Sequence, residues 1–250
     1  MNHSQKSAIY LVIAFLPLQV FAQEEPNLEY DLTYGISAVG LSGLYVGQED
    51  EVFAVPLLVV TTGNWTFNLT EGVSYQVFDN GASRLSAGLS YAVPEDVPNT
   101  ALYEGWTREA AVSANLNVQH DFGVFDVAAN IATELTNEHG GTSGALSVGR
   151  GFVLGNVIVE GRYGAQYLDS ASANYLYGVK SSESTAARST YDVSDSWSAY
   201  TEVSLTVPLN EQTAMSGFLR HDNLSDAISR SPLVAENERT FVGLSIVRRF

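Results

Sequence analysis

Apolar and polar residues alternate along most of this 250-residue sequence. Alternation with a period of two is typical of a β-strand that turns one apolar and one polar side to different surroundings. The alternating segments run for about 9 to 13 residues, whereas strands of soluble proteins usually contain 5 or 6 and tilted membrane strands 9 to 11. The sequence therefore predicts an all-β fold, a single transmembrane antiparallel up-and-down β-barrel, rather than a soluble sandwich.

Turns and loops divide the sequence into about eleven clear segments of this kind. Since a bacterial single-chain barrel has an even number of strands, we predict about 12 strands, with 10 as the alternative. The uncounted strand lies either before Asp79, where 65–77 looks like one strand with a polar breach at Glu71, or within 174–179. Tryptophans fall near predicted strand ends, where an interfacial aromatic girdle is expected: Trp65, Trp106 and Trp197.

The C-terminal segment has the strongest membrane-strand pattern of the chain. Alternate residues give it one apolar face that ends on an aromatic residue, which is typical of the strand read by the barrel assembly machinery: Val242, Leu244, Ile246 and Phe250.

The first 22 residues are predicted to be a cleaved secretory signal peptide. Lys6 precedes an apolar run over 8–20, and the small residue Ala22 precedes Gln23. The run of about 13 residues is shorter than the roughly 20 that a membrane-spanning helix needs. We therefore expect export, cleavage between Ala22 and Gln23, and a barrel domain over 23–250 in the outer membrane of a Gram-negative cell.

The composition excludes several classes of protein. With 12 Lys and Arg against 28 Asp and Glu, the net charge is −16, which argues against nucleic acid as a partner. The chain has no cysteine, so thiol catalysis and thiolate metal sites are excluded. The histidines do not lie beside a Gly-x-Ser-x-Gly elbow, and 48–51 lacks the spacing of a calcium loop. We predict no enzymatic activity, metal or cofactor.

Charged residues occur on the polar faces that a barrel turns toward its lumen. The candidates for lumen-facing polar residues are Glu109, Asp126, Glu134, Glu160, Arg162 and Glu202. In a narrow barrel they would pair and fill the interior, and in a wider one they would line water and favour cations because acids are in excess. The long loop 169–195 could constrict the mouth, form a contact surface or be disordered.

Several segments resemble, in their order and in their residues, segments of the MltA-interacting protein and OmpV family of outer-membrane proteins. These are the glycine-rich 40–45, the 55–57 Val-Pro-Leu, the 175–179 Tyr-Leu-Tyr-Gly-Val, the 231–234 Ser-Pro-Leu-Val and the terminal 248–250. The resemblance covers essentially the whole chain after the signal peptide. It implies an outer-membrane barrel without catalytic activity and carries no site residues with it.

Two functions follow from the resemblance. In the first, the barrel is a scaffold for murein-remodelling enzymes, with a periplasmic murein hydrolase or synthase as partner. In the alternative, it is a small cation-preferring pore for small solutes. In either case, lipid, lipopolysaccharide and the barrel assembly machinery are expected partners.

Overall fold

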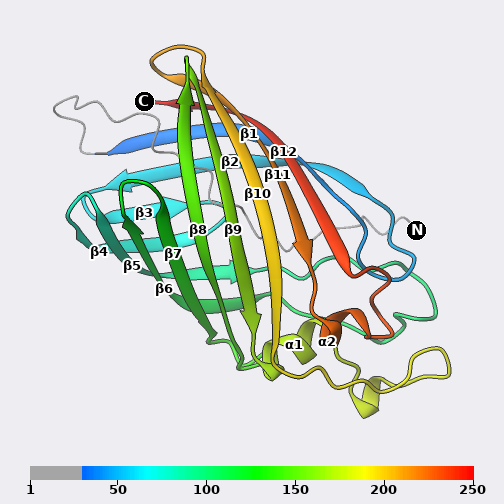
Figure 1. Ribbon diagram of the computed structural model, residues 1–250. Helices are drawn as coiled ribbons and strands as arrows, with labels where there is room; N and C mark the ends of the chain where they lie inside the picture. Colours follow the sequence, from blue (N-terminus) through cyan, green and yellow to red (C-terminus); the bar gives the residue numbers. More distant parts are fainter. Residues whose placement is uncertain (1–29) are drawn as a thin grey trace.

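The computed structural model describes residues 30–250, which form one closed antiparallel barrel of twelve strands (Figure 1). Each strand pairs with its neighbour in sequence, and β12 pairs with β1 from Thr33–Arg249 to Leu41–Phe241, which closes the sheet. The strands are β1 (Asp31–Leu41), β2 (Glu51–Thr62), β3 (Trp65–Asn68), β4 (Gly72–Asp79), β5 (Ser83–Ala92), β6 (Ala111–Asp121), β7 (Asp126–Glu134), β8 (Thr142–Leu154), β9 (Val157–Leu168), β10 (Ser196–Pro208), β11 (Thr213–Asn223) and β12 (Glu238–Arg249).

The strand count of twelve is confirmed, and the uncounted strand lies before Asp79. The region 65–77 is not one strand, because the chain turns at 69–71 and splits it into the short β3 and the longer β4. Gly72 ends this turn with φ = 104°, a conformation that side-chain-bearing residues rarely adopt. The alternative position was wrong, since 174–179 contains the end of a helix, α1 (Ser170–Tyr177).

The two faces of the sheet differ as membrane embedding requires. Ile36, for example, points outward and is 53% exposed, whereas its neighbour Ser37 points into the lumen and is 4% exposed. The predicted outward face of the C-terminal strand has the same character, with exposed Val242, Leu244, Ile246 and Phe250. A continuous exposed apolar belt of this kind is the lipid-facing surface of a membrane barrel. In the described part of the chain, no helix is long and apolar enough to span a membrane.

The two ends of the barrel carry different connections (Figure 1). Tight turns join strands at the end that also holds Phe250, and the long loops gather at the other end. The long loops contain α1, a short 3-10 helix η2 (Ser181–Glu183) and α2 (Asp226–Ser229). We call these loops together the loop cap: 42–50, 93–110, 135–141, 169–195 and 224–237. The predicted signal peptide 1–22 and its cleavage site at Ala22 and Gln23 lie outside the described residues.

Candidate functional site

The loop cap has an apolar core of its own. Leu44, Ala173, Val193, Ile228 and Val234 form one buried cluster, to which three separate connections contribute. These connections join the neighbouring strands from β9 through β12 and β1 to β2, so this core covers one side of the mouth. Loops that only projected into solvent would not bury such a cluster.

A second buried cluster joins the 93–110 loop to the others. It consists of Tyr45, Tyr103, Trp106, Val179 and Leu233. The Tyr103 hydroxyl donates to the Leu233 carbonyl at 2.9 Å, and the Trp106 indole donates to the Gly178 carbonyl at 3.3 Å. Trp106 therefore belongs to the cap core and not to an aromatic girdle, whereas Trp65 and Trp197 are exposed on the barrel wall.

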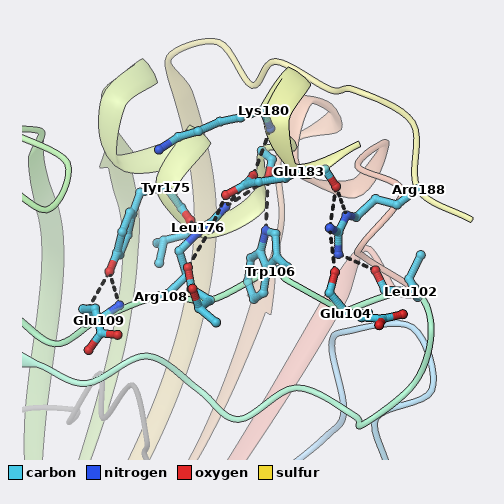
Figure 2. Close-up of polar contacts among 12 residues, drawn as sticks. Leu102, Glu104, Trp106, Arg108, Glu109, Tyr175, Leu176, Lys180, Glu183 and Arg188 are labelled. Atoms are coloured by element: carbon cyan, nitrogen blue, oxygen red, sulfur yellow. Dashed lines mark hydrogen bonds and ion pairs between the residues drawn. The ribbon is translucent and has the colours of Figure 1, made fainter. Parts of the chain in front are cut away.

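Arg108 fastens the 93–110 loop to the 169–195 loop (Figure 2). Its guanidinium forms an ion pair with Glu183 at 2.8 Å, donates to the Tyr175 carbonyl and lies 4.2 Å from the centre of the Trp106 ring. The Tyr175 hydroxyl in turn donates to the Glu109 carbonyl at 2.5 Å. One arginine thus holds both loops through charge, hydrogen bonds and a cation–π contact.

Arg188 makes the second polar connection between the same loops (Figure 2). Its side chain is among the most deeply buried of the described residues, at 1% exposed. It donates to the main-chain carbonyls of Leu102 at 2.5 Å, Glu104 at 3.2 Å and Glu183 at 2.9 Å. A buried arginine that satisfies three carbonyls from two loops is a structural fastener of the cap.

The carboxylates of the cap are stabilised in their charged form. Burial raises the pKa of Glu183, but the ion pair with Arg108 and the Lys180 main-chain N–H outweigh it and leave the pKa lowered. For Asp169, burial is likewise outweighed by hydrogen bonds from Ser172 and Thr142, so its pKa is also lowered. A lowered pKa contributes stability that is present above the ordinary pKa and is lost as the pH falls through the folded value.

We expect acid to loosen the cap. In a variant with Trp65→Phe and Trp197→Phe, Trp106 is the remaining tryptophan, and its emission should move to longer wavelength below about pH 4 as Glu183 and Asp169 take up protons. Adding Glu183→Gln should reduce this pH dependence, because one of the two titrating carboxylates is gone. An emission maximum that stays constant from pH 7 to pH 3 would contradict the account.

Three of the predicted lumen-facing residues meet inside the barrel. Arg162 on β9 forms ion pairs with Asp126 on β7 at 2.8 Å and with Glu160 at 2.7 Å. Gly149 on β8 lies between them in the ladder, and a Cβ there would come within 2.5 Å of the guanidinium. The missing side chain at Gly149 therefore lets Arg162 reach across a strand to Asp126.

Glu202 on β10, the strand next to β9, extends this group of charged lumen-facing side chains. The register pairs Glu202 on β10 with Arg162 on one side and Arg220 of β11 on the other, so the three side chains share the lumen face. Arg220 also forms an ion pair with Asp222 at 2.7 Å and lies 4.0 Å from the centre of the Tyr200 ring. We call Asp126, Glu160, Arg162, Glu202, Arg220 and Asp222 the charge row.

Two of the predicted lumen-facing residues, Glu109 and Glu134, are not part of the charge row. Glu109 is exposed in the loop before β6, because that strand begins only at Ala111, so its assignment to the lumen wall was wrong. Glu134 ends β7 and is buried, but its carboxylate accepts from the Gly140 N–H at 2.7 Å and from the Thr136 side chain at 2.5 Å. It therefore caps the 135–141 loop.

The sequence did not single out Arg108, Arg188, Arg220 and Asp222. Arg220 and Asp222 share a strand face, since they are two residues apart, and were therefore predictable. Arg108 and Arg188 were not, because most of their partners lie in segments distant along the chain. Within residues 30–250, no group of three His, Asp or Glu side chains could hold a metal ion.

The two sides of the lumen wall differ in solvent access. Hydroxyl residues on β10 to β12 and β1 are buried, including Ser204, Thr206, Ser216, Ser245 and Ser37. The lumen-facing residues of β5 and β6 are half-buried, among them Ser86, Ser90, Ser113, Asn115 and Asn117. The interior is therefore packed on one side and polar and partly accessible on the other.

Comparison with known proteins decides the family. The model of the family described as MltA-interacting protein MipA matches residues 35–250, nearly the whole described barrel. The chain belongs to the MltA-interacting protein family. Among relatives of this MipA-family chain, the putative outer membrane protein YiaT of Escherichia coli K12 is 23% identical over 85% of this chain and 88% of its own length.

Two further relatives bear the names that the sequence resemblance suggested. The outer membrane protein OmpV of Vibrio cholerae is 25% identical over 72% of this chain and 71% of its own, and the MltA-interacting protein of Escherichia coli K12 is 23% identical over 82% and 85%. The MipA-family barrel is also similar to a solved structure, the anion-selective porin from Comamonas acidovorans, with 9% identity, a TM-score of 0.44 and coverage of 88% and 98%.

Proposed function

We propose that this MipA-family barrel resides in the outer membrane as a non-enzymatic scaffold that binds a periplasmic murein-remodelling enzyme. The observation that carries the proposal is the loop cap, whose two apolar clusters span the mouth. A closed mouth suits an interaction protein better than an open channel. The relative named MltA-interacting protein supports this kind of partner.

The partner is expected to contact the short turns at the end of the barrel that holds Phe250, since short turns face the periplasm in bacterial single-chain barrels. We call this the periplasmic end. The neighbouring hairpins β6–β7 and β8–β9 both end in exposed apolar side chains: Val153 is 71% and Leu154 65% exposed at the end of β8, and Phe122 and Val124 are exposed in the β6–β7 turn. Solvent-facing turns are normally polar, and clustered apolar residues at their tips are typical of a binding surface. These four residues form the proposed periplasmic contact.

Affinity capture tests the proposal. The detergent-extracted barrel should retain a lytic transglycosylase of the MltA type, and the pair Val124→Asp and Leu154→Asp should reduce capture at least about tenfold, because two apolar contacts are lost. Leu209→Asp in the separate β10–β11 turn is the matched control and should leave capture unchanged. Equal capture by all three proteins, or none by the unmodified barrel, would contradict the proposal.

A second function is a small cation-preferring pore that opens when the cap moves. The half-buried polar residues of β5 and β6 favour it, since they offer a hydrated path along one side of the lumen. The charge row holds four acids and two arginines, which would favour cations. Discrete cation-selective conductance in a planar bilayer would support the pore, and a silent bilayer would support the scaffold.

A further inference from the structure

The barrel wall is interrupted beside β2. β3 pairs with β2 only over Val59–Thr62, and a single further bond runs from the Leu69 N–H to the Leu58 carbonyl. Among residues 30–250, the stretch 51–57 of β2 pairs with β1 alone. On the opposite side, residues 90–92 of β5 pair with β6 and not with β4. The β3–β4 hairpin is short and does not reach the loop cap. The part of the wall nearest the loop cap therefore lacks two strands between β2 and β5.

Pro56 identifies which edge of β2 is open. Since the Leu58 carbonyl points toward β3, the main-chain groups of Val52, Ala54 and Pro56 point the same way, because these groups alternate along a strand. Proline has no N–H to contribute to a ladder and within sheets is found at edges. An edge with proline is also a poor template for an added strand, so a second β-chain is not the expected occupant.

The interruption lies at the depth of the hydrocarbon. Pro56 is the register partner of Ile36, which belongs to the outward apolar belt, and Val52 next to the edge is 81% exposed. Loops close the interruption on the outer side, where the Gln48 amide donates to Glu95 at 2.7 Å. Two absent strands correspond to up to roughly 14 Å between the backbones of β2 and β5.

The lumen side of β2 is apolar where the other strands are polar. Val55 pairs with the lumen-facing Ser37, so Phe53, Val55, Leu57 and Val59 all face inward. Of these, Phe53, Leu57 and Val59 are half-buried. Apolar side chains on both faces of one strand form a continuous path from the lipid-facing surface, around the open edge, into the barrel.

Glu71 stands at the base of the interruption. It lies in the 69–71 turn and is exposed, and the Tyr91 hydroxyl of β5 donates to the Leu69 carbonyl of the same turn at 2.6 Å. A carboxylate at the depth of the hydrocarbon is costly unless water or a polar group accompanies it. The site thus combines an apolar wall with one carboxyl group.

We infer that the interruption between β2 and β5 is a lateral portal through which a single-chain amphiphile with a cationic or neutral head group enters the lumen from the membrane. The chain lies along Phe53, Val55 and Leu57, and the head group lies near Glu71. The inference is independent of the scaffold proposal, because it concerns the membrane-spanning wall and not the periplasmic turns.

Photolabelling in lipid vesicles tests the portal. A long-chain amine that carries a diazirine in its chain is added to the full barrel in phosphatidylcholine vesicles, irradiated, and mapped by mass spectrometry. Labels are expected on the lumen-facing Phe53, Val55 and Leu57 as well as on the lipid-facing surface, and not on Ser204 or Thr206. Labels confined to lipid-facing residues, or cross-linked dimers joined through β2, would overturn the inference.

Variants separate the chain site from the head-group site. Leu57→Asn should lower labelling of Phe53 about tenfold, because an amide replaces an apolar contact. Ala132→Asn, on the lumen face of β7, should not change it. The amine should label Phe53 more than the corresponding fatty acid does, and Glu71→Gln should remove that difference. Equal labelling by both probes in the unmodified barrel would overturn the assignment of the head group to Glu71.

Discussion

Replacing Arg188 with alanine is expected to open the loop cap while the barrel stays folded. The side chain satisfies carbonyls of Leu102, Glu104 and Glu183 in a buried position, and its loss leaves them without these donors. Each buried group left unsatisfied costs roughly 1–3 kcal/mol, so the cap should lose several kcal/mol of local stability. Because the barrel ladder does not involve Arg188, the unboiled protein should still migrate as a compact band on a denaturing gel.

Two measurements detect the opening of the loop cap in the Arg188→Ala variant. Limited proteolysis should cut the 169–195 loop in the Arg188→Ala variant under conditions in which the unmodified protein is resistant, and the emission of Trp106 should shift to longer wavelength. Arg230→Ala is the matched control, since Arg230 lies in the same cap but the side chains of its ion pair with Asp226 are 73% and 85% exposed. Such a pair contributes little. Equal cleavage of the two variants would contradict the assigned role of Arg188.

Replacing Arg162 with methionine is expected to destabilise the barrel itself. Its guanidinium neutralises Asp126 and Glu160, whose side chains are 16% and 18% exposed, and its register partner Glu202 is buried. Removing one partner from a fully buried ion pair typically costs about 3–5 kcal/mol, because the remaining charge is left uncompensated, so a loss near the lower end of that range is expected for these partly buried pairs. The midpoint of denaturant unfolding should therefore fall markedly in the Arg162→Met variant.

Arg84 offers the matched comparison for the charge row. It also forms an ion pair with an aspartate on a neighbouring strand, Asp79 at 3.1 Å, but its side chain is 39% exposed. Arg84→Met should cost at most about 1 kcal/mol, as exposed pairs do. Equal shifts of the two unfolding midpoints would mean that the lumen around Arg162 is hydrated, and would favour the pore over the scaffold.

The strands could be predicted from sequence because lipid and lumen impose opposite chemistry on alternate residues. The same rule failed at 65–77, where the outward apolar residues of β3 and β4 continue the alternation across the 69–71 turn. Glu71 and Gly72 were the available signals, a charge and a glycine within an otherwise regular pattern. In this chain the Val-Pro-Leu at 55–57 suits its place in the fold, since Pro56 lies on the edge of β2 that β3 does not cover.

The candidate site could be predicted only in part. Glu160 and Arg162 lie on one strand face by spacing alone, but their neighbours Asp126 and Glu202 depend on the register of separate strands. The loop cap was not predictable, because Arg188 bonds to residues more than 80 positions away and Trp106 looks like a girdle residue until the loops meet. The 169–195 loop is packed into the cap through α1 and Val193.

Closure of the barrel between its first and last strands is the central claim, and a cross-link tests it directly. Ser37 on β1 and Ser245 on β12 are register partners that both face the lumen, and the chain has no cysteine of its own. The double variant Ser37→Cys and Ser245→Cys should form a disulfide on mild oxidation, since directly opposed residues lie within bridging distance. Thr33→Cys with Ser245→Cys, four residues out of register, should not. A bridge in the second pair, or in neither, would contradict the closed twelve-strand barrel.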